Sequence, residues 1–305
     1  MATRMMRAAV IRRFGGPEVL EVSEVPVPTP EGDEVLIRVE TAGVGVWDAK
    51  ARSGAWGGKF PLVLGAEGYG IVEAVGPEAT FPVGERVWAY NYGGKKGGFY
   101  ADYCAVPSRG VAHAPPRLSD EELGGTPVAA VTAWTGIHDV LEVEQSDVVV
   151  VHGATGSVGV CALQFADWTH ARVFATASHD GDLLRKLGAA DVFDVRTEAG
   201  RAALRAAFDE VTKVLLTAPW PDELDELLHE LIIAHPNGVP VPSGVTATAF
   251  DGAPRRELWD VMNPQIESHH FQLPIEATFP LAEVRQAHEA LARRGRTGTI
   301  VLRLR

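Results

Sequence analysis

A glycine-rich segment carries the strongest chemical signal in the sequence. It reads Gly153-Ala154-Thr155-Gly156-Ser157-Val158-Gly159 and lies between the β-branched run Val148–Val151 and a segment of helical composition, Val158–Asp167. In such a turn the first glycine allows a tight bend, the second lets the backbone approach a pyrophosphate, and the third lets helix and strand pack closely. The helix N-terminus adds free N–H groups and a partial positive charge. The segment predicts a dinucleotide-binding turn; a tight strand–helix turn without a ligand is the alternative.

The end of the next predicted strand, Arg172–Thr176, predicts which dinucleotide binds. An acidic residue about 20 positions beyond the glycine turn would bind a ribose 2′-hydroxyl and favour NAD. Ser178 stands there instead, 19 residues after Gly159, and His179 follows it. Both side chains can donate hydrogen bonds to a 2′-phosphate, so the sequence predicts NADPH as the cofactor. An ordinary polar loop is the alternative, and the nearby Asp180 would repel a phosphate.

The length and net charge of the chain limit the classes of function that it can have. The chain has 305 residues, which suits two domains of about 150 residues each, and a formal net charge of −12. So acidic a chain is poorly suited to nucleic acid or to an anionic membrane surface, and no apolar run approaches the about 18 residues of a membrane span. A small-molecule substrate is therefore the expected partner.

The cysteines and the first residues indicate a compartment. Two cysteines, Cys104 and Cys161, cannot form a disulfide framework and suit a reducing cytosol. They are also too few for a cysteine-rich structural zinc site. Residues 1–13 lack the apolar core of a signal peptide. The expected localisation is cytoplasmic.

The pattern of predicted secondary structure changes near residue 120. Before it, short apolar runs such as Val35–Val39 and Ile71–Val75 alternate with glycine turns, which predicts a twisted antiparallel sheet or partial barrel. Ser119 with Glu122 three residues later forms a capping box that begins a helix. After it, strands predicted at residues 148–151, 172–176 and 191–194 alternate with helices, which predicts an α/β fold with a doubly wound parallel sheet.

The C-terminal part adds further elements. Apolar spacing predicts a helix over Leu224–Ile233 and another from Phe279 to about Arg294. Val245–Phe250 alternates as an edge strand does. Gly298–Leu304 is a terminal strand expected to return to the first domain. The predicted domains are residues 1–122 together with 270–305, and residues 123–269.

The order of several motifs resembles one enzyme family. The motifs are Gly15–Leu20, Gly65–Gly70, Pro82–Val87, Pro127–Trp134 and Val151–Gly159. Together, from about residue 6 to the end, they are similar to the zinc-independent branch of the medium-chain dehydrogenase/reductase superfamily, which includes quinone oxidoreductases and enoyl reductases. The resemblance implies a GroES-like β-rich domain, a Rossmann domain, and hydride transfer from NADPH to a conjugated carbonyl or a quinone.

The resemblance also assigns roles to single residues. Ala66 replaces the histidine that the zinc-dependent branch carries before Glu67, which predicts no metal site. Thr132 and Thr217 would face the nicotinamide, and Asp48 and Lys50 match a segment under the cofactor. The remaining candidate catalytic residues are Asn91 and Tyr92, on a loop expected at the mouth of the cleft. A tyrosine hydroxyl, with a pKa of about 10, can deliver a proton to an enolate; loop packing is the alternative for Tyr92.

Departures from the family pattern keep other functions open. Gly45 replaces a common asparagine, the loop after the fourth strand reads Leu216–Trp220, and the expected next strand, Val239–Ser243, holds two prolines that suit an edge or loop. The segments that would surround the nicotinamide therefore differ from the family pattern. A non-redox step, such as cyclisation or conjugate addition on a polyketide-like substrate, is the alternative, and a non-catalytic binding protein is a third. A homodimer through the edge strand is expected.

Overall fold

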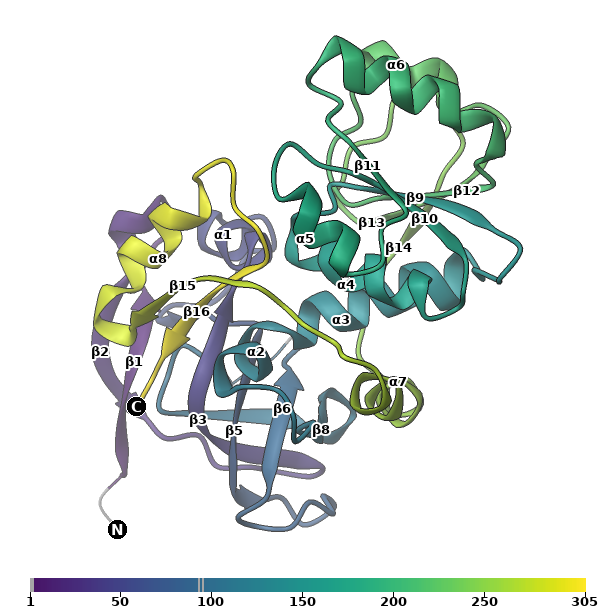
Figure 1. Cartoon of the computed structure of the whole chain (residues 1–305). Helices are drawn as coiled ribbons and strands as arrows, with labels where there is room; N and C mark the ends of the chain where they lie inside the picture. The colour runs from purple at the N-terminus through teal and green to yellow at the C-terminus, as the bar shows by residue number, and fades with distance from the viewer. Residues whose placement is uncertain (1–2, 93, 95) are drawn as a thin grey trace. The chain divides into compact units, whose positions relative to one another are not determined.

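The N-terminal part of the chain folds around antiparallel sheets in the computed structural model, which describes residues 3–92, 94 and 96–305 (Figure 1). By its internal contacts the chain divides into two units. The first comprises Met1–Val128, Pro254–Arg294 and Thr299–Arg305, and the second comprises Ala129–Ala253 and Gly295–Gly298.

The first unit contains a three-stranded sheet, in the order β2-β1-β4, and a seven-stranded sheet, in the order β15-β16-β3-β5-β6-β8 with β7 paired to β3. Its strands are β1 (Met5–Ile11), β2 (Glu21–Pro26), β3 (Glu34–Val44), β4 (Leu62–Val63), β5 (Glu67–Val75), β6 (Arg86–Tyr90), β7 (Tyr103–Pro107), β8 (Val111–His113), β15 (Ile275–Pro280) and β16 (Thr299–Arg303). Its helices are α1 (Val46–Ser53), α2 (Asp120–Gly125), α7 (Arg256–Ser268) and α8 (Val284–Leu291). The β-rich architecture expected for this part of the chain is confirmed.

Alternation along β3 shows why this unit folds as a sheet. Val35, Ile37 and Val39 are fully buried in one hydrophobic cluster. On the alternate positions Leu36 is buried in a second cluster and Arg38 is half-buried. The predicted capping box is confirmed at the start of α2. There the Ser119 Oγ accepts the Glu122 N–H at 3.2 Å, and the Glu122 Oε2 accepts the Ser119 N–H at 3.0 Å. Two backbone donors at the helix N-terminus are thereby satisfied.

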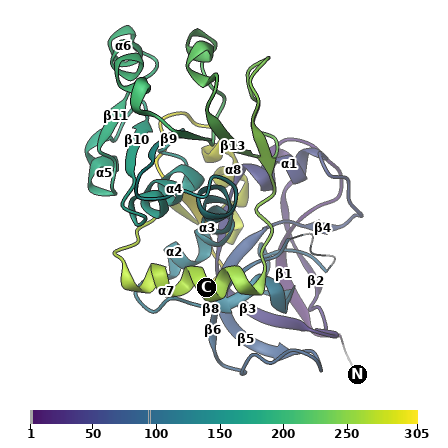
Figure 2. The ribbon, with the colours of Figure 1, turned by 90° about the vertical axis from the view of Figure 1, so that its right-hand side faces the viewer.

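The second unit is built on a six-stranded parallel sheet (Figure 2). Its strands are β9 (Val148–His152), β10 (Arg172–Thr176), β11 (Asp191–Phe193), β12 (Lys213–Leu216), β13 (Ile232–Pro236) and β14 (Thr248–Phe250). They lie in the order β11-β10-β9-β12-β13-β14, so the third, second and first strands are followed by the fourth, fifth and sixth. This is the order of a Rossmann fold, and the predicted fold class is confirmed.

Helices connect these strands and carry their apolar residues into the core. They are α3 (Pro127–Trp134), which continues as a π-helical segment over Thr135–Val140, then α4 (Ser157–Asp167), α5 (Gly181–Lys186) and α6 (Glu198–Ala207). The central strand β9 is buried on both faces, with Val149, Val150 and Val151 fully inaccessible. A continuous β-branched run is what a parallel strand covered on both sides requires.

The predicted helix over Leu224–Ile233 is wrong. Asp222–Leu228 forms a 3₁₀ helix, and the chain then enters β13 at Ile232. Leu224 and Leu228 are buried, whereas Leu227 and Leu231 are only partly buried. The β-branched pair Ile232–Ile233 extends the sheet beside β12. Short apolar runs do not distinguish the two structures by periodicity alone. Val239–Ser243, whose two prolines suit an edge or a loop, lies in the loop between β13 and β14, in agreement with that interpretation.

Three further predictions concern the C-terminal part. β14 lies at the edge of the sheet as predicted but begins only at Thr248. The helix expected from Phe279 begins at Val284, because Ile275–Pro280 forms β15 beside β16. The terminal strand does return to the first unit, where β16 pairs antiparallel with β3 (Figure 1).

The predicted domain limits, after residue 122 and before residue 270, differ from the contact division, which places α7 in the first unit. Helix α7 packs there through Trp259, whose ring lies 5.6 Å from that of Trp88 and whose Nε1 donates to the Arg109 carbonyl at 3.1 Å. The limits of the functional domains stay a prediction.

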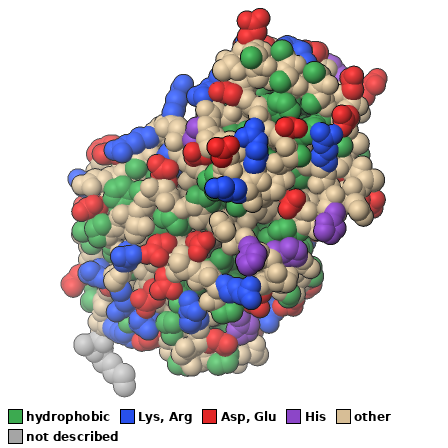
Figure 3. Space-filling view, viewed as in Figure 1, with side chains coloured by type: hydrophobic (Ala, Val, Ile, Leu, Met, Phe, Trp, Pro, Cys, Tyr) green, Lys and Arg blue, Asp and Glu red, His purple; other side chains and the backbone are tan. Residues whose placement is uncertain are grey.

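The surface is polar and mixed in charge. On the face drawn in Figure 3, acidic and basic side chains are interspersed. None of the helices in the described part of the chain combines the length and the apolar character that crossing a membrane requires.

Candidate functional site

The second unit has a topological switch point between β9 and β12. These neighbouring strands are the first and fourth of the sheet, so the chain continues outward from them in opposite directions. Ligands of open parallel sheets bind beyond the carboxyl ends of the strands at such a point. His152 and Gly153 stand at that end of β9, and Thr217 follows β12. The glycine turn therefore lies where the fold provides a crevice.

The three glycines of the turn meet different surroundings. Gly153 has φ +79°, and a Cβ there would lie 2.7 Å from the Thr217 Oγ1. A Cβ on Gly159 would lie 2.3 Å from the Gly153 carbonyl oxygen. At Gly156 the nearest atom of the described residues to an added Cβ would be the Gly153 oxygen, at 3.5 Å. The protein itself requires the first and third glycines, whereas the second faces open space.

Backbone hydrogen bonds hold the residues of the turn that precede helix α4. The Ala154 N–H donates to the Thr176 carbonyl at 3.1 Å, and the Thr155 carbonyl accepts the Gly298 N–H at 2.8 Å. Ser157 and Val158 are the first residues of α4, whose first turn holds no acidic residue, and both are partly exposed. Their N–H groups form the N-terminus of an 11-residue helix, which favours an anion.

His152 is a site residue that sequence reasoning missed. The Thr176 Oγ1 lies 2.7 Å from its Nδ1, and the Pro219 carbonyl lies 2.9 Å from its Nε2. Because a carbonyl oxygen can only accept, Nε2 carries the proton and Nδ1 accepts the threonine hydroxyl. Burial lowers the pKa of His152 to about 4, so the ring stays neutral. A histidine directly before the first glycine was the available signal.

The loop after β12 is anchored to the same strand end. The Thr217 Oγ1 donates to the His152 carbonyl at 2.6 Å, and the Trp220 ring packs 4.9 Å from that of His152. Trp220 is buried in the core of the second unit. Thr132 on α3 is 8% exposed, and an added Cβ on Gly252 would lie 2.5 Å from its Oγ1. The roles of Thr132 and Thr217 at a nicotinamide stay predictions.

The predicted phosphate donors Ser178 and His179 are hydrogen-bonded to each other. The Ser178 Oγ lies 2.8 Å from the His179 Nδ1, and the His179 Nε2 lies 3.2 Å from the Arg296 carbonyl. Nε2 must donate to that carbonyl, so Nδ1 accepts the serine proton. Neither side chain keeps a spare proton in this arrangement.

Asp48 organises two loops of the first unit. It lies on α1, and its carboxylate accepts the N–H groups of Gly45, Gly65 and Ala66 at 3.0, 3.2 and 3.1 Å. Burial raises its pKa from 3.8 to about 6, because desolvation of the charge outweighs these donors. This is the geometry of a structural anchor; a direct role for Asp48 in catalysis stays a prediction.

A second buried carboxyl, Glu67, lies at the start of β5. Its Oε2 accepts the Val128 N–H at 2.6 Å, and burial holds its pKa well above the ordinary value. Gly43 leaves room for it, since a Cβ there would lie 2.4 Å from the Glu67 Oε1. Among the described residues, no group of three or more His, Cys, Asp and Glu side chains could hold a metal ion.

The remaining predicted catalytic residues have different surroundings. Lys50 is exposed on α1. Asn91 is buried, and its Nδ2 donates to the Gly97 carbonyl at 2.7 Å, which fixes the loop. Tyr92 is 37% exposed, with its ring edge-on to that of Tyr90 at 5.6 Å. Lys50 and Tyr92 are thus both accessible, as a proton donor must be, and their roles in catalysis stay predictions.

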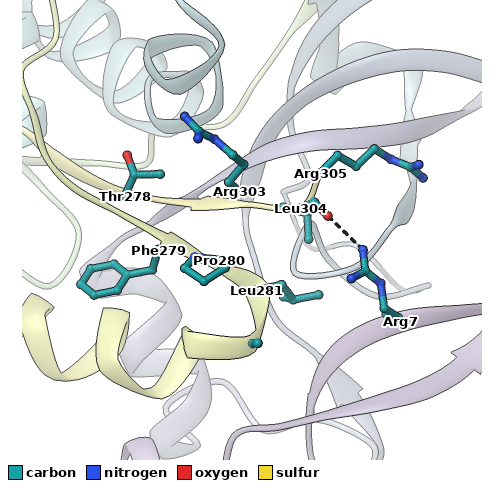
Figure 4. Close-up of a pocket in the computed structure, with 9 residues that line it drawn as sticks. Arg7, Thr278, Phe279, Pro280, Leu281, Arg303, Leu304 and Arg305 are labelled. Atoms are coloured by element: carbon teal, nitrogen blue, oxygen red, sulfur yellow. Dashed lines mark hydrogen bonds between the residues drawn. The ribbon is translucent and has the colours of Figure 1, made fainter.

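The first unit also contains a groove of about 510 Å³ whose lining includes none of these residues (Figure 4). It is lined by Phe279–Ala282, Thr278, Leu304 and three arginines, Arg7, Arg303 and Arg305. Arg7 is paired with Asp102 at 2.8 Å and donates to the Leu304 carbonyl, as Figure 4 shows. Arg303 is paired with Glu121. Carboxylates satisfy two of its cations, so the groove is not a candidate active site.

Known proteins resemble this chain over its whole length. A family model, the alcohol dehydrogenase GroES-like domain, matches residues 31–116. A quinone oxidoreductase from Lama guanicoe is 30% identical, with 100% of both chains covered. Among solved structures, an NAD-dependent alcohol dehydrogenase is 27% identical with a TM-score of 0.88, covering 98% of this chain and 100% of that one. A mycobacterial protein solved in complex with NADPH is 27% identical with a TM-score of 0.83 and the same coverage.

Proposed function

Since the chain belongs to the quinone oxidoreductase family, in the zinc-independent branch of the medium-chain dehydrogenases/reductases, we propose that it uses NADPH to reduce a quinone or an enone. It is an NAD(P)-dependent oxidoreductase that acts on a small molecule. The choice of NADPH over NADH, and the conjugated carbonyl as an alternative to a quinone, are the parts we propose.

The observation that carries this proposal is the open space at Gly156. The Rossmann strand order puts the turn at the switch point, and a Cβ added at Gly156 would come within 4 Å of only one described atom, the Gly153 carbonyl oxygen at 3.5 Å. Gly153 and Gly159 are explained by packing, whereas the protein's own packing does not require a glycine at Gly156. A pyrophosphate supplies the reason, because its oxygens need close backbone approach.

The bound cofactor would supply a hydride to the substrate. Residues at the switch point would hold its phosphates, through the N–H groups of Ser157 and Val158 at the head of α4. Hydride addition to a conjugated carbonyl leaves an enolate that needs a proton. We assign that proton to the Tyr92 hydroxyl, which is partly exposed.

Binding of the two reduced cofactors tests the proposal directly. The chain has seven tryptophans, so quenching of tryptophan fluorescence during titration with NADPH, and separately with NADH, reports binding. We expect tighter binding of NADPH, followed by its oxidation when a quinone or an enone is added. Binding of neither cofactor by the folded protein would refute the proposal and favour a non-redox step such as cyclisation.

Replacing Tyr92 with phenylalanine tests the proton donor. We expect kcat for an enone to fall about 100-fold, the usual contribution of a general acid, with the NADPH dissociation constant unchanged. Tyr90→Phe is the matched control, because it removes a hydroxyl from the neighbouring ring, which lies at the end of β6. Full activity of the Tyr92→Phe variant in steady-state assays would leave Tyr92 as a packing residue.

We also propose a cytoplasmic homodimer that pairs through β14. Thr248 and Ala249 are exposed on this edge strand, and an unpaired edge invites a second strand. Cys104 and Cys161 are buried and form no disulfide, which suits a reducing compartment. Light scattering of the purified protein should give twice the chain mass of 32.7 kDa; the mass of a single chain would refute the dimer.

A further inference from the structure

His152 joins three strand ends at the switch point of the second unit. It is the last residue of β9, and the parallel register puts it beside Thr176 of β10 and Leu216 of β12. Its ring accepts the Thr176 hydroxyl at Nδ1, at 2.7 Å, and donates from Nε2 to the Pro219 carbonyl, at 2.9 Å. One side chain therefore links the end of β10 to the loop that follows β12.

The loop after β12 is attached twice to His152. It reads Thr217-Ala218-Pro219-Trp220-Pro221, and its two prolines have no N–H to donate. At its start the Thr217 N–H and hydroxyl both donate to the His152 carbonyl, at 3.0 and 2.6 Å. Two residues later the His152 ring binds the Pro219 carbonyl. The backbone of His152 thus holds one end of this segment, and its side chain holds the other.

The same loop contacts the first glycine of the turn. A Cβ on Gly153 would lie 2.7 Å from the Thr217 Oγ1 and 2.8 Å from the Ala218 Cβ. On the other side the Gly153 N–H donates to the Thr176 Oγ1 at 3.3 Å, and this is the hydroxyl that donates to His152. A displacement of the loop would therefore change the surroundings of the glycine turn.

The His152 ring is committed entirely to these contacts. It is 5% exposed and packs 4.9 Å from the Trp220 ring. Burial lowers its pKa to about 4, so at neutral pH the ring has one donor and one acceptor, and both are used within the protein. It has no proton to offer a substrate, so any effect on catalysis must act through the segments that it holds.

From this arrangement we infer that His152 is a positioning residue, which fixes Thr217–Trp220 against the glycine turn and so shapes the β12 side of the crevice. The inference rests on the proposed function, because it assumes that a dinucleotide binds there. A dinucleotide bound across a switch point has its adenosine half toward the second strand of the sheet and its nicotinamide half on the opposite side. Loosening the loop should therefore impair hydride transfer more than binding of the adenosine half.

Kinetics and calorimetry of two variants test the inference on the full chain. His152→Phe keeps an aromatic ring but removes both side-chain hydrogen bonds. We expect kcat for quinone reduction to fall about 10- to 100-fold, because a displacement of about 1 Å can cost about 100-fold in rate. The dissociation constant of ADP-ribose, which lacks the nicotinamide, should stay unchanged. His152→Gln should recover most of the activity, since its amide can accept from Thr176 and donate to Pro219.

The matched control is His235→Phe, at the same end of the next strand, β13. The Nδ1 of His235 lies 3.2 Å from the carbonyl of its own neighbour Pro236, so this variant should keep the wild-type kcat. A wild-type kcat in His152→Phe would overturn the inference. Equal weakening of ADP-ribose and NADPH binding, with no recovery in His152→Gln, would also overturn it, because it would indicate a general loss of packing.

Amide hydrogen exchange without any cofactor separates failure of this inference from failure of the proposed function. His152→Phe should speed exchange in Thr217–Trp220, and His152→Gln should restore the wild-type rate. Unchanged exchange in His152→Phe would overturn the attachment of the loop by His152. If the wild type bound neither dinucleotide while the exchange pattern held, the proposed function would fail and the attachment of the loop would be supported.

Discussion

Replacing Gly156 with valine should abolish dinucleotide binding while leaving the protein folded. A Cβ at this position would lie no closer than 3.5 Å to any described atom, and Gly156 has an extended conformation, φ −69° and ψ 159°, that any residue adopts. The valine side chain would occupy the space in front of the α4 N-terminus. Losing two charge-assisted hydrogen bonds to a pyrophosphate corresponds to at least about 100-fold in affinity.

Two measurements distinguish this effect from misfolding. Urea denaturation of Gly156→Val should give a free energy of unfolding within about 1 kcal/mol of the wild type, the ordinary cost of an apolar N-cap. Gly159→Val should instead cost about 3 kcal/mol or more, since its Cβ would lie 2.3 Å from a backbone oxygen. If Gly156→Val bound NADPH as tightly as the wild type does, the glycine turn would not be part of the binding site.

Asp48→Ala should destabilise the first unit by about 3 kcal/mol or more. The substitution leaves three N–H groups, those of Gly45, Gly65 and Ala66, without their acceptor, and each buried unpaired donor costs about 1 kcal/mol or more. Lys50→Ala is the matched control on the exposed face of the same helix and should change stability by less than about 0.5 kcal/mol. Urea denaturation at pH 7 measures both; equal stabilities would refute the anchoring role of Asp48.

The same carboxyl predicts a pH dependence. Its pKa is about 6 in the folded chain against an ordinary 3.8, so the folded state holds the proton more tightly. The protonated carboxyl stabilises the folded state by about 3 kcal/mol, fully below pH 3.8. This stabilisation is lost as pH rises through 6. Asparagine does not titrate, so the deficit of Asp48→Asn relative to the wild type should shrink from pH 4.5 to pH 7. A deficit independent of pH would show that Asp48 does not titrate in this range.

The fold was predictable where local patterns and the tertiary structure demand the same conformation. The β-branched run at β9 and the Ser119–Glu122 capping box each have one plausible structure, and both formed as expected. Leu224–Ile233 failed because its apolar spacing suits a helix, whereas the sheet needed a fifth strand. The pairing of Lys213 with Ile232 across β12 and β13 is a non-local contact that spacing within one segment does not encode.

The candidate site was predictable to a smaller extent. The glycine turn could be predicted because each of three glycines at fixed spacing has its own reason, two of them steric. His152 could not, since its importance depends on which strand ends lie side by side. The sequence also presented Ser178 and His179 as free donors, and their mutual hydrogen bond is visible only in three dimensions.

The position of β16 has a consequence for biosynthesis. This strand comprises residues 299–303 and lies inside the seven-stranded sheet, between β15 and β3. The parallel sheet of the second unit is complete by residue 250. On a ribosome, which delivers the N-terminal strands first, the seven-stranded sheet begins at β3 but stays incomplete until residues 299–303 emerge, and the β3 edge at Thr41–Val44 lacks its β16 partner until then. Truncation near residue 298 should consequently release an aggregation-prone chain rather than a shorter enzyme.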